Sequence, residues 1–250
     1  MTRLTLEQEL AACTERCKNM DAPLEVRLSA MADDVRRLSS DFADIVDRMV
    51  ARLKQAGTGA AAPQIGEPMP EFALPDDSGR LTSLAELLQS GKVVIAFHRG
   101  HWCPYCHINL ETLTNIEPEV KAAGGQLVVI TPETQKFSKQ FKIETGADFP
   151  MLTDIDCGYA LELQLAILIN QEKRTAMTQA GWDISPYNAN DNWILPIPAT
   201  FVVGQDSIIT VESPQISSTQ RISDFCVLFV LLHCYQHVSS QQRRLFSNAN

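Results

Sequence analysis

The chain has 250 residues, of which 45% are hydrophobic and 20% are charged, and its formal net charge is −9. This length and composition are typical of a globular protein with one main domain plus an extension. The negative charge, with no basic cluster, argues against a nucleic-acid surface. The charged start of the chain lacks the apolar core of a signal peptide, and seven cysteines do not fit a secreted disulfide framework. We therefore expect a cytoplasmic protein that binds neither nucleic acid nor membrane.

Residues 1–56 contain no glycine and a single proline, Pro23, and they predict a helical extension of two helices separated at that proline. The second helix carries an apolar stripe with steps of four and three residues. The stripe comprises Leu24, Leu28, Met31, Val35, Leu38, Phe42, Ile45 and Met49. Either the main domain or a second copy of the chain in a homodimer must cover this stripe, and the sequence leaves both open. Cys13 and Cys17, on one face of the first helix, are interpreted as packing residues.

Residues 57–66 are rich in small residues and proline and predict a linker, which places the main domain at residues 67–250. Strands and helices are then expected to alternate and to end in an antiparallel pair of strands. The expected strands are 93–97, 126–131, 149–152, 197–203 and 207–211, and the expected helices are 104–123, 133–144 and 156–169, with a polar excursion at 170–195. This order predicts an α/β fold with a mixed central sheet flanked by helices.

The segment from about residue 213 onward is the least informative part of the chain. Residues 225–232 form an apolar run that is too short to span a bilayer, and we expect a buried helix there. The nearby His233, Cys234 and His237 are interpreted as packing residues rather than metal ligands. The sequence indicates no role for Cys226.

The motif Cys103-Pro-Tyr-Cys106 lies between the apolar strand 93–97 and a segment of helical spacing. Both cysteines are therefore expected at the N-terminus of a helix. Unpaired backbone N–H groups and the helix dipole stabilise a thiolate at that position, and a thiolate is the nucleophile of redox exchange. Because the two cysteines share one helical turn, a reversible Cys103–Cys106 disulfide is expected.

The motif has other interpretations. Half of a zinc knuckle is disfavoured because no second Cys-x-x-Cys pair follows. Together with His107, the motif matches the attachment signature of c-type haem, but haem attachment takes place outside the cytoplasm. Two inert structural cysteines remain a further alternative. We prefer the redox interpretation, with neither metal nor cofactor expected.

The strand, the Trp-Cys-Pro-Tyr-Cys motif and the later run Ile197–Val203 make residues 63–212 resemble the thioredoxin-fold suprafamily. More narrowly, the segment Phe97–Cys106 resembles peroxiredoxin-like proteins of the alkyl hydroperoxide reductase and thiol-specific antioxidant group. The resemblance implies a thioredoxin-like fold with an N-terminal helical extension. It also implies that Pro198 is a cis-proline facing the two cysteines.

As implied by this resemblance, the protein is a thiol-dependent peroxidase acting on hydrogen peroxide or organic hydroperoxides. Cys106 occupies the peroxidatic position and would form a sulfenic acid, which condenses with Cys103 or with Cys157. A thioredoxin-like protein or a small thiol would then reduce the disulfide. Cys103 replaces the usual Thr or Ser, and Pro198 lies about where an activating Arg is expected. We expect a slow peroxidase.

Two alternatives stay open. In a thioredoxin-like thiol-disulfide oxidoreductase, Cys103 would be the more exposed cysteine and would attack first. A binding or regulatory module without turnover is the other. In either enzyme, Arg99, His98 and His101 are candidates to stabilise the thiolate by their charge, and Trp102 is expected to shield the pair by packing.

Overall fold

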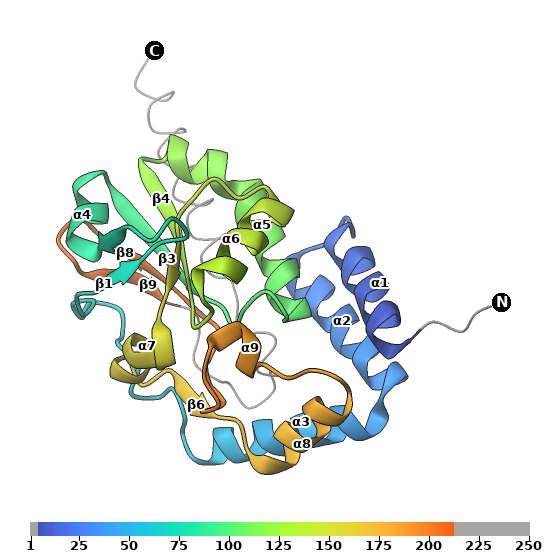
Figure 1. The fold of residues 1–250 in the computed structure, drawn as a ribbon. Helices are drawn as coiled ribbons and strands as arrows, with labels where there is room; N and C mark the ends of the chain where they lie inside the picture. Colours follow the sequence, from blue (N-terminus) through green and yellow to red (C-terminus); the bar gives the residue numbers. More distant parts are fainter. Residues whose placement is uncertain (1–4, 213–250) are drawn as a thin grey trace.

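The computed structural model describes residues 5–212 (Figure 1). The helices are α1 (Leu6–Lys18), α2 (Leu24–Leu38), α3 (Ser40–Gln55), α4 (Leu84–Gln89), α5 (Pro104–Ala122), α6 (Gln135–Thr145), α7 (Gly158–Glu162), α8 (Gln171–Gln179) and α9 (Ser185–Asn188). The strands are β1 (Ala73–Pro75), β2 (Leu81–Ser83), β3 (Lys92–Phe97), β4 (Gly125–Thr131), β5 (Met151–Thr153), β6 (Ala166–Leu168), β7 (Ile194–Pro196), β8 (Ala199–Val203) and β9 (Ile209–Glu212). No helix within this range is long and apolar enough to cross a bilayer.

Several sequence predictions fall outside this range. They are the helix at residues 225–232 and the roles considered for Cys226, His233, Cys234 and His237.

The central sheet has five strands in the order β5-β4-β3-β8-β9. Strands β3, β4 and β5 are parallel and are linked by the crossover helices α5 and α6, whereas β8 and β9 are antiparallel to their neighbours. The predicted α/β fold with a mixed central sheet is therefore confirmed, as is the antiparallel pair at its end. Because β3 lies in the centre of the sheet, the loop that follows it is supported on both sides.

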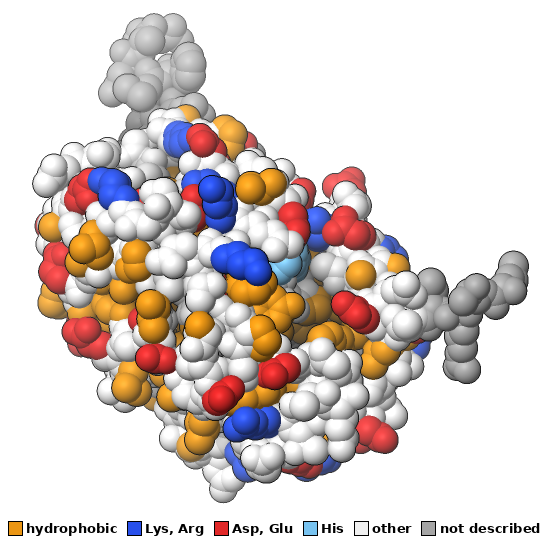
Figure 2. Space-filling model, in the orientation of Figure 1, with side chains coloured by type: hydrophobic (Ala, Val, Ile, Leu, Met, Phe, Trp, Pro, Cys, Tyr) orange, Lys and Arg blue, Asp and Glu red, His pale blue; other side chains and the backbone are white. Residues whose placement is uncertain are grey.

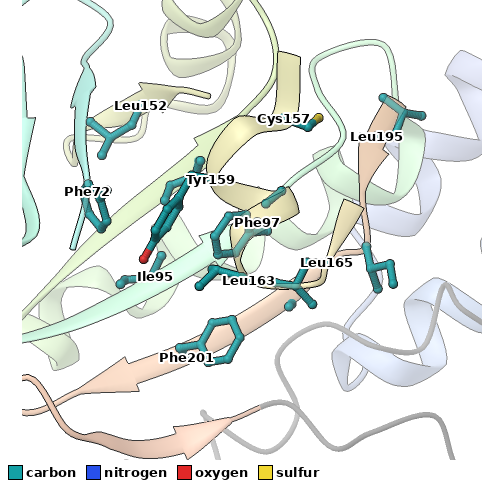
Figure 3. Close-up of a cluster of buried hydrophobic side chains, with 14 of the residues drawn as sticks. Phe72, Ile95, Phe97, Leu152, Cys157, Tyr159, Leu163, Leu165, Leu195 and Phe201 are labelled. Atoms are coloured by element: carbon teal, nitrogen blue, oxygen red, sulfur yellow. The ribbon is translucent and has the colours of Figure 1, made fainter. Parts of the chain in front are cut away.

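The two faces of the sheet bury alternate residues, because successive side chains of a strand point to opposite sides. Ile95 and Phe97 of β3 pack on one face with Tyr159 and Phe201 (Figure 3). The Phe97 ring stacks on Tyr159 at a centroid distance of 6.0 Å. Residues of α4, α7, β6 and β7 complete this cluster.

On the other face, Val94 and Ala96 pack in a second cluster with α5, α6 and the N-terminal helices. Leu28 and Met31 of α2 are buried there, at 1% and 0% exposure. Buried Arg27 ties α2 to its neighbours, since its Nε donates to the carbonyl of Cys17 at 2.9 Å and a terminal nitrogen donates to Thr112 Oγ1 at 3.1 Å. The main domain thus packs against residues from both halves of the predicted stripe, since Phe42 and Met49 of α3 belong to the cluster on the first face. A homodimer through these helices stays a prediction.

The N-terminal extension has three helices rather than the predicted two. Pro23 separates α1 from α2 as expected, but the second predicted helix is interrupted at Ser39, whose φ and ψ are −152° and 86°. Serine side chains compete for backbone hydrogen bonds and weaken a helix interior, and here two serines stand in succession. The interruption turns α3 away from α2 and lays it beside α8 (Figure 1).

The predicted helix 156–169 is wrong. Asp156, Cys157 and Gln164 have positive φ values of 59°, 57° and 58°, which an α-helix does not tolerate. The helix shrinks to α7, and β6 follows it and pairs with β7. The excursion at 170–195 is correspondingly more ordered than predicted, because it contains α8, α9 and the start of β7.

The packing of α2 gives a test of stability. Met31→Ala is expected to lower the free energy of unfolding by about 2–5 kcal/mol, because it leaves a cavity between α1, α2 and α5. Val26, on the same helix but 48% exposed, provides the matched control Val26→Ala. Denaturant unfolding of both variants checks the difference, and equal stabilities would contradict the packing described here.

Candidate redox site

The Cys-x-x-Cys motif lies at the predicted helix N-terminus. Strand β3 ends at Phe97, a short loop follows, and Cys103 is the N-cap of α5 with an extended φ and ψ of −95° and 115°. Pro104 occupies the first turn of the helix, where its missing N–H costs nothing. The backbone N–H of Cys106 donates to the carbonyl of Cys103 at 3.0 Å. Residues 5–212 contain five cysteines, and all carry free thiols.

Both cysteines are buried, at 1% exposure for Cys103 and 3% for Cys106. The expectation that Cys103 is the exposed member of the pair is therefore wrong, because the N-terminal helices and α8 close over it. The two residues line different spaces. Cys103 lines a cavity of about 120 Å³ together with Trp102, whereas Cys106 lines a pocket of about 10 Å³ with His98.

The two thiols differ in pKa. Burial opposes ionisation of Cys103, but hydrogen bonds from the Cys106 thiol and from backbone N–H groups, together with the charge of Arg99, lower the pKa of Cys103 to about 6. Burial and the neighbouring Cys103 raise the pKa of Cys106 well above its usual value, although the Arg99 N–H donates to its Sγ at 3.4 Å. Cys103 is therefore the thiolate of the pair at neutral pH, and Cys106 is the thiol.

The supporting residues differ in what they contribute. Arg99 lines both spaces, lies over the Tyr105 ring at 5.8 Å and favours the thiolate form of Cys103. His98 is fully buried, and burial lowers its pKa to about 3, so it is neutral and provides no positive charge. His101 turns away from the cysteines, with Nε2 at 2.8 Å from a carboxylate oxygen of Glu144. Trp102 packs against both core clusters and lines the cavity beside Cys103, and its shielding role stays a prediction.

The expectation for Pro198 is wrong in its geometry. Residues 5–212 contain no cis peptide bond, although Pro198 does line the small pocket beside Cys106. The trans form is intrinsically preferred even before proline, and here it leads directly into β8, whose first residue pairs with Phe97. The alternative partner Cys157 belongs to the cluster on the opposite face of the sheet, where its Sγ donates to the Ile194 carbonyl at 3.4 Å.

The sequence analysis missed Glu133, a buried carboxyl group beneath the loop that carries the cysteines. Its side chain is 0% exposed, and Oε2 accepts a hydrogen bond from the His101 N–H at 2.7 Å. Burial raises the pKa of Glu133 to about 8. A signal was present, because Glu133 closely follows β4, the parallel neighbour of β3.

A second missed group consists of His101, His107 and Glu144, whose side chains offer ligand-type atoms within 4.8 Å of one another. These groups already pair among themselves. His107 Nε2 lies 2.6 Å from the His101 carbonyl, and burial lowers the pKa of His107 to about 4, so its ring is neutral and Nε2 donates. The arrangement braces the start of α5 against α6.

Glu133 leaves no room for a side chain at Gly100. A Cβ on Gly100 would lie 2.5 Å from the Glu133 carboxyl, and Gly100 has a φ of +131°. Gly100→Ala is expected to lower the melting temperature and to change the alkylation rate of Cys103, because the loop must move. Gly146→Ala is the matched control, since Gly146 has a φ of +68° with nothing within 4 Å of its added Cβ. Equal losses in both variants would show that backbone strain alone is responsible.

A family model described as AhpC/TSA family matches residues 65–212. The chain belongs to the AhpC/TSA family. The recognition made from the sequence is thereby confirmed, and the matched segment holds the sheet, both cysteines and α8.

Curated relatives include the thiol-disulfide oxidoreductases ResA of Bacillus thuringiensis and Bacillus anthracis, each 29% identical over 92 residues. The match covers 36% of this chain and 52% of each relative, so the chain spans about half the length of these proteins.

Similar solved structures include peroxidoxin BcpB from Mycobacterium tuberculosis, with 20% identity and a TM-score of 0.51, covering 64% of this chain and 90% of that one. A PrxQ mutant from Xylella fastidiosa is 13% identical with a TM-score of 0.52, covering 70% and 98%. These likenesses show a shared fold.

Proposed function

We propose that this AhpC/TSA-family protein is a thiol-dependent peroxidase that reduces hydrogen peroxide or organic hydroperoxides. The supporting observation is the place of Cys103, which is 1% exposed yet lines a cavity of about 120 Å³. A small molecule fits such a cavity, whereas a disulfide on the surface of another protein cannot reach a sulfur at that depth. The thiolate character of Cys103 supplies the nucleophile.

The proposed reaction begins with attack of the Cys103 thiolate on the terminal oxygen of the hydroperoxide. The S–O bond forms as the O–O bond breaks, so Cys103 becomes a sulfenic acid and the remaining oxygen leaves as an alkoxide or hydroxide that takes up a proton. The Cys103 thiolate that raised the pKa of Cys106 is now gone, so the Cys106 thiol loses its proton as its sulfur attacks the Cys103 sulfur. The S–S bond forms, and the hydroxyl of the sulfenic acid leaves with a proton as water.

This order reverses the assignment that the family resemblance implies, in which Cys106 attacks first. Cys106 lies beside a pocket of only about 10 Å³, and its raised pKa keeps it protonated. A protonated thiol suits the second step, where it must stay unreactive until the sulfenic acid has formed. A thioredoxin-like protein or a small thiol is proposed to reduce the disulfide, and a small thiol fits the buried site better.

A thiol-disulfide oxidoreductase is the second candidate. The ResA relatives are named for this activity, and a low pKa at the first cysteine of a Cys-x-x-Cys pair suits it equally well. In this case Cys103 would attack a substrate disulfide and Cys106 would resolve the mixed disulfide. Burial of both sulfurs limits the substrate to small disulfides.

A titration separates the two candidates. The fully reduced protein is mixed with less than one equivalent of hydrogen peroxide or cumene hydroperoxide, and thiols are counted before and after. We expect two thiols lost for each peroxide consumed, within seconds. A parallel reaction with oxidised glutathione and with insulin tests the second candidate. Rapid reduction of oxidised glutathione or of insulin without peroxide consumption would reject the peroxidase proposal.

A further inference from the structure

The cavity at Cys103 extends under the N-terminal extension. Its wall is formed by α2, α3, α8 and the start of α5, and its lining is largely apolar, including Phe42, Val46 and Met49 of α3. Trp102 and Trp182 also line it. Hydrophobic side chains gather in the hollow between the N-terminal helices and the rest of the molecule (Figure 2). This wall is suited to a hydrocarbon chain, and an adjoining space of about 330 Å³, which shares Val35, Phe42 and Trp182 with the cavity, adds to the 120 Å³ beside Cys103.

One ionisable side chain is buried in this apolar wall. Lys173 of α8 is 6% exposed and lines the cavity together with Cys103. Within residues 5–212, its ammonium group makes neither a hydrogen bond nor an ion pair with a carboxylate. Burial lowers the pKa of Lys173 to about 7, and a carboxylate bound beside it would favour the charged form of the lysine.

The fold holds Lys173 in this orientation. The preceding residue, Glu172, points outward and pairs with Arg48 of α3 at 2.5 Å. This ion pair ties α8 to α3, and consecutive residues of a helix point in different directions. Lys173 is therefore directed inward.

The charged groups around the cavity favour binding of one more negative group. When Lys173 is protonated, Arg99 and Lys173 lie near the single Cys103 thiolate, which leaves one positive charge in excess. Elsewhere in the lining, Arg36 and Asp47 pair with each other at 2.6 Å and are partly exposed. A strongly hydrated anion such as phosphate is disfavoured by the apolar wall.

We propose that the cavity is a binding site for medium-chain monocarboxylates, with the carboxylate on Lys173 and the hydrocarbon chain along α3. The ligand is recognised by one charge-assisted hydrogen bond and by burial of its chain. The hydroperoxide of such a carboxylic acid would be the preferred oxidant of Cys103, and this substrate preference rests on the proposed function. Binding of the carboxylate itself does not depend on catalysis.

The test is binding of decanoate and of decanol to the reduced protein, measured by calorimetry and by the fluorescence of the tryptophans. Decanoate is expected to bind about tenfold or more tightly than decanol. Lys173→Met should lose this preference while keeping the affinity for decanol, and Lys173→Arg should retain it. Lys139→Met, which removes an exposed lysine of α6, is the matched control and should bind as the unchanged protein does.

Protection of Cys103 provides a second measurement. Decanoate should slow alkylation of Cys103 by iodoacetamide in the unchanged protein and in Lys139→Met, and should not slow it in Lys173→Met. Equal affinities of the unchanged protein for decanoate and decanol would overturn the proposal, as would full decanoate binding by a folded Lys173→Met protein.

Failure of this proposal is distinguishable from failure of the proposed function. A protein that binds decanoate but consumes no peroxide retains the site and loses the peroxidase assignment. A protein that consumes peroxide but does not discriminate decanoate from decanol retains the peroxidase assignment and loses the site.

Discussion

Cys103→Ser is expected to abolish peroxide-dependent oxidation of the protein, whereas Cys106→Ser should keep the first chemical step. Serine at position 103 cannot supply a thiolate, and the remaining Cys106 is held as a thiol by burial. We expect a fall of at least about a hundredfold in the rate of peroxide consumption for Cys103→Ser, because nucleophilic attack contributes most of the acceleration. Stopped-flow measurement of peroxide loss checks this.

Dimedone, which labels sulfenic acids, identifies the sulfur that reacts first. In Cys106→Ser the label should appear on Cys103, because no neighbouring thiol is left to condense with it. Label on Cys106 in the Cys103→Ser protein would contradict our order and support the one implied by the family resemblance. Cys157→Ser is the matched control, since Cys157 is equally buried but lies on the opposite face of the sheet.

The elements that the sequence predicted well are those with a strong local pattern. The apolar run of β3 and the helical spacing after Cys106 are clear in the sequence, and they place the two cysteines at a helix N-terminus without further information. The antiparallel pair of β8 and β9 was similarly visible, because a turn separates two apolar runs.

The elements that the sequence predicted badly depend on contacts between distant segments. Strand β6 exists because it pairs with β7, which lies more than twenty residues further along the chain. The apolar residues of this region suit either a helix or a short strand, and the positive φ values that decide between them are set by tertiary packing. The break at Ser39 was missed for a different, local reason, because the heptad-like stripe continues across the two serines that weaken the helix there.

In the candidate site, the sequence identified both cysteines, Arg99 and Trp102, which all belong to one short motif. It missed Glu133 and Lys173, because each reaches the motif from a different part of the chain. It also assigned His98 a possible charge that burial removes. Motif residues can thus be recognised from spacing, whereas their protonation states depend on the fold around them.

The pH dependence of the site follows from the different pKa values of the two thiols. Because hydrogen bonds and Arg99 lower the pKa of Cys103 to about 6, below the ordinary value near 9, this thiol should be mostly ionised at pH 7. Because only the thiolate reacts, the rate of Cys103 alkylation should rise between about pH 5 and pH 7 and stay constant above this range. Cys106 should not contribute below pH 9, because its pKa is raised.

Thiolate absorbance at 240 nm in a pH titration measures this directly, with Cys103→Ser as the blank. The hydrogen bond from the Cys106 thiol is a major cause of the low pKa of Cys103, so replacing the donor changes the midpoint in a defined direction. Cys106→Ser retains a donor and should keep the midpoint low, whereas Cys106→Ala removes it and should raise the midpoint. A midpoint near 9 in the unchanged protein would show that the helix N-terminus and Arg99 do not stabilise the Cys103 thiolate. An unchanged midpoint in Cys106→Ala would show that these two groups stabilise the thiolate without Cys106.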